Sequence, residues 1–270
     1  MERLRHHLFR RHMVRWMLVP AALTVFVLAG CSDDDDDDDD GPTPTSTSLA
    51  GGFAGGTAGV ATETGTLAIT IQSGTLAARF PSATATSLVR PASAVVVAAA
   101  GTMDPEGIGS TISVSGSYNT DNDSLVLNGG GYALRGRRTN TGAGQSIEGT
   151  YSGPNGTGAF YLLDAAGAPL QSYCGSYGSG AQTDSGFVAL TVRGSSLTGL
   201  SVSELDFSDI IRWNGTITGT GTARDIEIED PLNPGGAPLA EGTWDTSLDT
   251  MNGTYGFGGD TGTWDATLCD

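Results

Sequence analysis

The chain of 270 residues contains no lysine, and its three histidines, His6, His7 and His12, all lie within the first twelve residues. Lysine forms Schiff bases and binds phosphate in P-loops, while histidine is the usual general base near neutral pH and a common zinc ligand. If these first residues are removed, as the next features indicate, the remaining chain lacks the groups for Ser-His-Asp, Cys-His or zinc-hydrolase chemistry. No catalytic residue, metal site or cofactor is predicted, and the protein is not expected to be an enzyme.

Long apolar runs are also scarce, and the run from Trp16 to Gly30 is too short to span a bilayer as a helix. Five arginines precede this run, and it ends in Leu28-Ala29-Gly30-Cys31, with small residues before the cysteine. These features resemble the signal peptide and lipobox of a bacterial lipoprotein precursor. The resemblance implies that residues 1–30 are removed and that Cys31 is acylated as the first mature residue. It implies a cell-envelope protein held by its lipid anchor, with the outer membrane as the expected location.

Positive charge is rare in the mature chain. Removal of Glu2 and five arginines leaves 29 acidic residues and eight arginines, a formal charge of −21. Nucleic acid and anionic lipid headgroups would be repelled, so neither is expected as a partner. Asp33–Asp40 is an unbroken acidic run followed by Pro, Thr and Ser, and it has no apolar residues to bury. Residues 31–50 are therefore predicted to be the lipidated cysteine and a disordered tether, with cation binding or surface export as alternative roles.

Glycine accounts for 41 residues, and no segment after Cys31 holds a long apolar period of 3.6 residues. Apolar and polar residues alternate instead, which is typical of strands with one buried face. The clearest alternating segments are Leu67–Ile71, Ile112–Val114, Ile226–Ile228 and Trp264–Leu268. Turn-forming residues separate the segments, as at Asn119–Asp123 and Gly153–Gly156. The body is therefore predicted to be all-β and to consist of consecutive antiparallel hairpins.

The two halves of the body resemble each other. Gly55–Ile71 aligns with Gly175–Val192, and later motifs keep their order, as Glu148-Gly-Thr-Tyr151 does with Asn252-Gly-Thr-Tyr255. Each copy holds about eight short strands, the number at which an antiparallel meander closes into a small barrel. The sequence thus predicts two tandem barrel-like repeats, over residues 51–168 and 169–270.

Copy one is expected to carry an insertion at residues 81–110, with Ala94–Ala100 as its apolar centre. We interpret this insertion as an extra edge strand or a short helix over a barrel mouth. A lid or a partner-binding flap is the alternative, because long inserted loops often carry function.

The cysteines support closure of the second copy. The alignment places Cys174 on its first strand and Cys269 on its last, where copy one has Ala54 and Ala165. A disulfide requires Cα atoms within about 7 Å, so pairing would make these two strands neighbours, as in a closed barrel. Two thiolates without histidine form only half a zinc site, and export favours oxidation, so a disulfide is predicted. Both cysteines have the parity of the polar face, which places the bridge on the outside of the seam.

A Gly-[Thr/Ser]-aromatic triplet recurs along the body. Its aromatic residues are Tyr118, Tyr151, Tyr177, Trp244, Tyr255 and Trp264. Core packing is the favoured role, because aromatic residues at strand period are normally buried, and a platform for sugars or apolar ligands is the alternative. Together with the cysteines, the triplets resemble calycin-like or lipocalin-like barrel domains of secreted bacterial proteins. The resemblance implies an architecture and no functional residue.

Two polar clusters remain. Asn119–Asp123 and the set Asp245, Asp249 and Asp260 lack the spacing of a calcium loop, so solvated turns are favoured over calcium binding. Arg135-Gly-Arg137-Arg138 is the one basic cluster of the mature chain. Salt bridges to neighbouring carboxylates are expected, and contact with an anionic ligand is the alternative.

Three functions stay open at this stage. The favoured one is a structural or interaction lipoprotein, expected to be monomeric, with filled barrels and an envelope protein or polysaccharide as partner. The second is binding of a small apolar molecule or glycan in a barrel mouth near the insertion, which requires an unfilled interior. The third, a carboxylate-dependent glycan hydrolase, is disfavoured by the composition.

Overall fold

The computed structural model describes residues 45–57, 61–73, 96–107, 109–141, 144–179, 185–230, 236–257 and 260–269. The predictions for the signal peptide, the lipidated Cys31 and most of the tether therefore lie outside the described residues. Thr43–Asp270 form one compact unit. Within the described ranges, no helix has the length and apolar character needed to cross a membrane.

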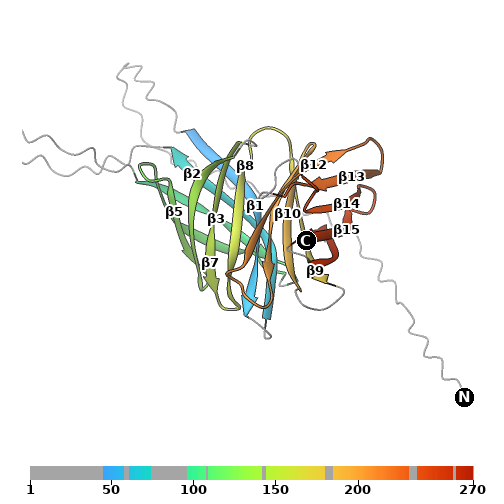
Figure 1. Ribbon diagram of the computed structural model, residues 1–270. Helices are drawn as coiled ribbons and strands as arrows, with labels where there is room; N and C mark the ends of the chain where they lie inside the picture. The colour runs from blue at the N-terminus through green and yellow to red at the C-terminus, as the bar shows by residue number, and fades with distance from the viewer. Residues whose placement is uncertain are drawn as a thin grey trace, which may run out of the picture. The chain divides into compact units, whose positions relative to one another are not determined.

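Eight antiparallel strands, paired in chain order, form the first closed barrel, coloured from blue to yellow-green in Figure 1. They are β1 (Thr45–Thr57), β2 (Ala61–Ser73), β3 (Val96–Pro105), β4 (Ile112–Asn119), β5 (Ser124–Gly129), β6 (Tyr132–Thr141), β7 (Gly144–Gly153) and β8 (Gly156–Asp164). Pairing of β1 with β8, from Leu49 opposite Asp164 to Gly56 opposite Thr157, closes this barrel.

The second closed barrel repeats the same order of strands. They are β9 (Leu170–Ser179), β10 (Ser185–Arg193), β11 (Ser196–Ser203), β12 (Ile210–Thr218), β13 (Ala223–Ile228), β14 (Ala240–Asp245), β15 (Thr250–Phe257) and β16 (Asp260–Leu268). Here β9 pairs with both β10 and β16. The prediction of an all-β body with two antiparallel eight-stranded repeats is confirmed.

Every second side chain along a strand points inward, and these side chains fill the barrel interiors. In β4, Val114 and Tyr118 are buried while Ser113 and Ser115 are exposed. The two barrels also repeat a ring contact. Phe53 and Tyr151 meet edge to face with centroids 5.4 Å apart in the first barrel, and Tyr177 and Tyr255 do so at 5.6 Å in the second. Edge-to-face pairs add stability beyond the area that they bury, so these ring contacts between strands stabilise each core.

The barrels pack against each other through strands that are buried on both faces. β8 carries the continuous run Ala159–Leu163, in which Phe160 and Leu162 face the barrel interior. Ala159, Tyr161 and Leu163 face the other way and pack with residues of the second barrel. Those partners are Ala189, Leu200 and Val202, with Leu170, Phe187, Phe207 and Ile210 at the edge. A second apolar face thus replaces the polar face that a lone barrel would expose.

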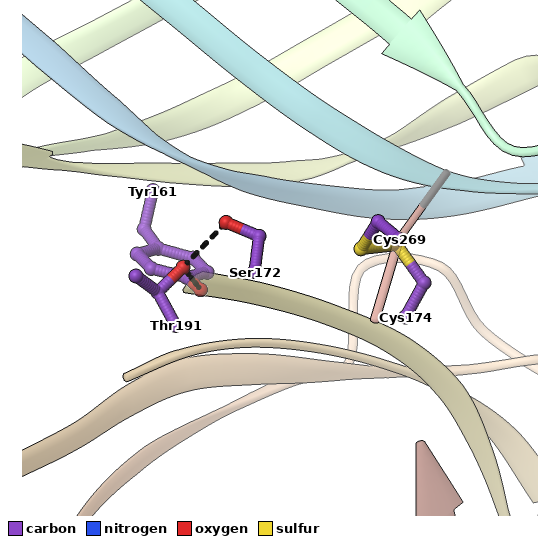
Figure 2. Close-up of a disulfide and its surroundings, with 5 residues drawn as sticks. All are labelled: Tyr161, Ser172, Cys174, Thr191 and Cys269. Carbon is purple, nitrogen blue, oxygen red and sulfur yellow. Dashed lines mark hydrogen bonds between the residues drawn. A yellow bond between two sulfur atoms is a disulfide. The ribbon is translucent and has the colours of Figure 1, made fainter. Parts of the chain in front are cut away.

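Polar contacts complete this interface. The Tyr161 hydroxyl donates to Thr191 Oγ1 at 2.6 Å, and Thr191 Oγ1 lies 3.1 Å from Ser172 Oγ, as Figure 2 shows. Burial raises the pKa of Tyr161, so its hydroxyl stays protonated and keeps its role as donor. Farther along, Arg212 of β12 forms an ion pair with Glu148 of β7.

The predicted disulfide joins Cys174 and Cys269, with Cα atoms 5.2 Å apart. It lies on the outside of the seam, as strand parity predicted, yet Cys174 is only 5% exposed. Cys174 lies opposite Ala189, which belongs to the interface between the barrels. Glu106 of the first barrel also lies beside both sulfur atoms. The bridge is therefore outside its own barrel and covered by the other one (Figure 2).

The strand register corrects the alignment of the copies. Phe53 lies opposite Phe160, and Tyr177 lies opposite Trp264, which makes Phe53 and Tyr177 equivalent. Ala50 is then the equivalent of Cys174, and the predicted match with Ala54 is wrong by four residues. Phe53 pairs with Gly65, twelve residues on, whereas Tyr177 pairs with Gly186, nine residues on. The first hairpin of copy one is longer, and repeated glycines hid this difference in the sequence.

Two predicted boundaries also differ from the structure. β1 begins at Thr45, inside the predicted tether, because Thr45–Ala50 pair with the end of β2. The predicted insertion at 81–110 contains β3, which pairs along both sides with β2 and β4 and is neither an edge strand nor a helix. Most of the extra length of copy one lies at residues 74–95, between β2 and β3. These residues, and with them part of the predicted lid, are outside the described ranges.

Candidate functional site

The first barrel has a cavity at the end where β1 begins and β2 ends, which we call the open mouth. Its volume is about 150 Å³. The lining residues are Thr47, Leu49, Ile71, Gln72, Val97, Tyr118, Thr120, Arg138, Ser146 and Ile147. Leu49, Ile71, Val97 and Ile147 belong to the barrel core, so the wall of the cavity is mostly apolar. Arg138 is the one charged residue in the lining.

Arg138 reaches the open mouth because of its parity on β6. Tyr132 and Leu134 on this strand are buried in the core, and Arg138 follows them at the same period of two. The Tyr118 hydroxyl donates to Asp123 Oδ1 at 2.6 Å and accepts a hydrogen bond from Arg138. Burial and the bond to Asp123 raise the pKa of Tyr118, and Arg138 opposes this shift. Tyr118 thus holds both charged groups at the rim of the cavity.

The opposite end of the first barrel is closed. Glu63 is 4% exposed, and its Oε1 accepts hydrogen bonds from the Tyr132 hydroxyl and from Asn155 Nδ2. Burial is the main cause that raises the pKa of both Tyr132 and Tyr151, and the next is the hydrogen bond to Glu63 for Tyr132 and the Glu63 charge for Tyr151. Between the two ends lie fully buried side chains that include Phe53, Leu67, Met103, Leu125 and Leu127. The open mouth is therefore a shallow cavity with an apolar floor.

The second barrel has different residues at the equivalent positions. Register equates Gly136, opposite Gly149, with Gly242, opposite Gly253, so Arg138 corresponds to Trp244. In the same way Leu49 corresponds to Tyr173. Tyr173 is fully buried, Trp244 is 5% exposed, and their rings meet edge to face with centroids 6.0 Å apart. Two large rings thus stand in the second barrel where the first has leucine and arginine at its open mouth.

The six predicted aromatic residues all lie inward, and the structure separates them. Tyr118 lines the open mouth. Tyr151 belongs to the core of the first barrel, and Tyr177, Trp244 and Trp264 belong to the core of the second, with Tyr255 packed against it. Tyr118 is the member of this set that both packs in the core and lines the open mouth.

The basic cluster is split by strand parity. Arg135 and Arg137 are exposed on β6, whereas Arg138 lies in the open mouth. Arg138 does not form the expected salt bridge, because it pairs with no carboxylate of the described residues. The ion pair found among the described residues joins Arg212 and Glu148. Sequence reasoning gave the three arginines one role. The alternation from Tyr132 to Arg138 was the signal that could have separated them.

The acidic turns are held by their own hydrogen bonds. The Asp121 N–H donates to Asn119 Oδ1 at 2.9 Å, and Asp245 Oδ1 accepts from Ser247. These bonds satisfy turn side chains in the way that Asx turns usually do. Within the described ranges, the group of potential metal ligands is Glu106 with Cys174 and Cys269, and the disulfide joins both sulfur atoms.

Two further hollows, of about 170 and 370 Å³, lie where the barrels meet and share Thr150 and Ile210. Glu148 and Arg212 line the smaller one and bind each other across the interface. The open mouth lies within a single barrel and combines an apolar wall with one inward arginine, so it is the stronger candidate site. No protein-family model, curated protein or solved structure matches this chain, so its function has to be inferred from this site.

Proposed function

We propose that this protein is a lipid-anchored envelope protein whose first barrel binds a small molecule in the open mouth. The observation that supports binding is the cavity of about 150 Å³ with an apolar floor and one inward arginine. Ligand sites are typically concave and mostly apolar, with a few polar groups that fix orientation. The lipobox and the tether support the proposed location at the membrane, and they are independent of the binding proposal.

The second barrel is proposed to have a structural or interaction role. Its interior holds Trp213, Trp244, Trp264, Tyr173 and Met251, all of them buried. This filled core favours support of the first barrel, through the interface at Tyr161, over a second ligand site. An external protein or polysaccharide partner of the whole molecule is compatible with this division of roles.

The binding proposal is tested by native mass spectrometry of the mature protein, purified gently from its source membrane. Excess mass that is lost on denaturation is expected, because a preformed apolar cavity gains from excluding water. The matched variant is Leu49→Tyr with Arg138→Trp, which gives the first barrel the two rings of the second. This variant should stay folded and carry no excess mass, while Arg137→Gln on the outer face of β6 should retain it. Bare mass for the natural protein, in repeated preparations, would contradict binding.

The proposed lipid anchor at Cys31 has its own test. Cys31→Ser removes the thiol that the lipobox would acylate, so the variant is expected to leave the membrane fraction and appear in the soluble envelope fraction. Immunoblotting of fractionated cells measures this distribution. If Cys31→Ser sediments with membranes as fully as the natural protein does, the proposed lipid anchor is wrong, and the binding proposal is unaffected.

A further inference from the structure

Of the two charged residues near the open mouth, one lines the cavity and the other does not. Arg138 lines the cavity, whereas Asp123, its neighbour across the strand pair, does not. The Asp123 carboxylate accepts the Tyr118 hydroxyl at 2.6 Å. Arg138 pairs with no carboxylate of the described residues and reaches only the neutral oxygen of Tyr118. A guanidinium has five N–H donors, so most of its hydrogen-bonding capacity stays available to a ligand.

The size of the cavity limits the rest of the ligand. A dry cavity of about 150 Å³ is known to hold a molecule the size of benzene. The floor of the open mouth is made of core residues such as Leu49 and Ile147, and Glu63 lies beyond the apolar layer at the far end. A long apolar chain would therefore have no channel to enter. The ligand body is expected to be about one ring, or a branched chain of similar volume.

We propose that the open mouth binds a small monocarboxylate, with its carboxylate on Arg138 and an apolar body of about benzene size against Leu49, Ile71, Val97 and Ile147. This inference rests on the proposed binding function and adds the charge and size of the ligand. A carboxylate accepts two parallel N–H bonds from a guanidinium, and such charge-assisted bonds are stronger than neutral ones. The apolar wall also excludes water that would weaken them.

In the second barrel, large side chains occupy the positions equivalent to those of the open mouth. There Trp244 replaces Arg138, and Arg224 stands at the position of Asp123. The guanidinium of Arg224 lies 5.1 Å from the centroid of the Trp244 ring. The arginine at that rim is thus engaged with a ring of its own core. In the first barrel the ring is absent, and the arginine that stands in its place faces the cavity.

Three probes of equal size and different charge test the inference: benzoate, benzyl alcohol and benzylamine, titrated calorimetrically into the mature full-length protein after it has been denatured and refolded to remove any retained ligand. Benzoate is expected to bind tightest and benzylamine weakest. Arg138→Gln should weaken benzoate about tenfold while it changes benzyl alcohol less than about twofold, since it removes one charge-assisted pair. Asp123→Asn should strengthen benzoate, because it removes a repulsive charge and keeps the acceptor for Tyr118. Asn also tolerates the positive φ of 56° at this position.

The outcomes separate the two proposals. If benzyl alcohol binds as tightly as benzoate, and Arg138→Gln leaves their ratio unchanged, the site binds small molecules and the carboxylate inference is wrong. If Arg137→Gln, on the exposed face, weakens benzoate as much as Arg138→Gln does, overall charge explains the preference and the inference is again wrong. If no probe binds and the natural protein carries no excess mass, the binding function itself fails. Preference for benzoate that is lost only with Arg138→Gln supports the inference.

Discussion

Replacement of Trp264 with alanine is expected to lower the free energy of unfolding by about 3 to 5 kcal/mol, the range for deletion of a fully buried large aromatic side chain. Trp264 is 1% exposed and meets Trp213 edge to face with centroids 5.4 Å apart. It also lies against a pair of facing glycines. A Cβ at Gly242 would be 2.6 Å from its Cζ2, and one at Gly253 would be 2.7 Å from its Nε1. Neither glycine has a side chain that could fill the space left by the indole.

Equilibrium unfolding in urea, followed by circular dichroism, measures this effect as a lower midpoint with an unchanged slope. The matched control is Trp264→Phe, because the equivalent residue of the first barrel is Phe160, which lies over its own glycine at Gly136. This control should cost clearly less than Trp264→Ala. Equal losses for the two variants would mean that burial of a ring at this position is not what stabilises the second barrel.

Removal of the disulfide is expected to have an effect of similar size. The bridge joins residues 95 positions apart. Constraint of a loop of this length is worth about 4 to 5 kcal/mol in the chain-entropy model, and measured values more often fall at about 2 to 4 kcal/mol. The double variant Cys174→Ala with Cys269→Ala avoids a free thiol. Alanine also fits sterically, because the first barrel has Ala50 and Ala165 at the equivalent positions.

The two seams share their backbone geometry, which offers a reciprocal experiment. The Cys269 N–H donates to the Ser172 carbonyl at 2.9 Å, and the Ala165 N–H donates to the Ser48 carbonyl at 2.8 Å. Ala50→Cys with Ala165→Cys should therefore form a bridge in the first barrel and raise its unfolding midpoint. Thiol titration and urea unfolding under non-reducing conditions follow both variants. An unchanged midpoint after loss of the natural disulfide would show that the seam is held by its strand pairing alone.

Much of the fold could be predicted because its determinants are local. Alternation such as Ile226–Ile228 specifies a strand with one buried face, and turns such as Gly153–Gly156 specify where a hairpin reverses. The recurring triplets revealed the duplication, and the cysteines pointed to a closed second barrel. Boundaries that depend on long-range pairing were missed. β3 was placed in an insertion because its run of valine and alanine resembles an edge strand or a helix as much as a barrel strand.

The candidate site could be predicted only in part. The sequence offered Arg135, Arg137 and Arg138 as one cluster, and it offered six aromatic residues with one role. Which arginine faces the interior depends on the phase of β6, and which aromatic residue borders a cavity depends on what fills the space beside it. The first could have been read from the alternation of Tyr132, Leu134 and Arg138, whereas the second is not local, because residues of several strands line the cavity.

The sequence by itself determined the class of fold, the number of repeats, the disulfide and the absence of lysine and of histidine beyond His12, since these follow from composition and from patterns within a few residues. The tertiary structure alone decided that the two barrels differ at their equivalent ends. Equivalent positions hold Leu49 and Arg138 in one barrel and Tyr173 and Trp244 in the other. Closure of the strands brings each pair together from distant parts of the chain. Side-chain volume at those positions then leaves one mouth open and packs the other with rings.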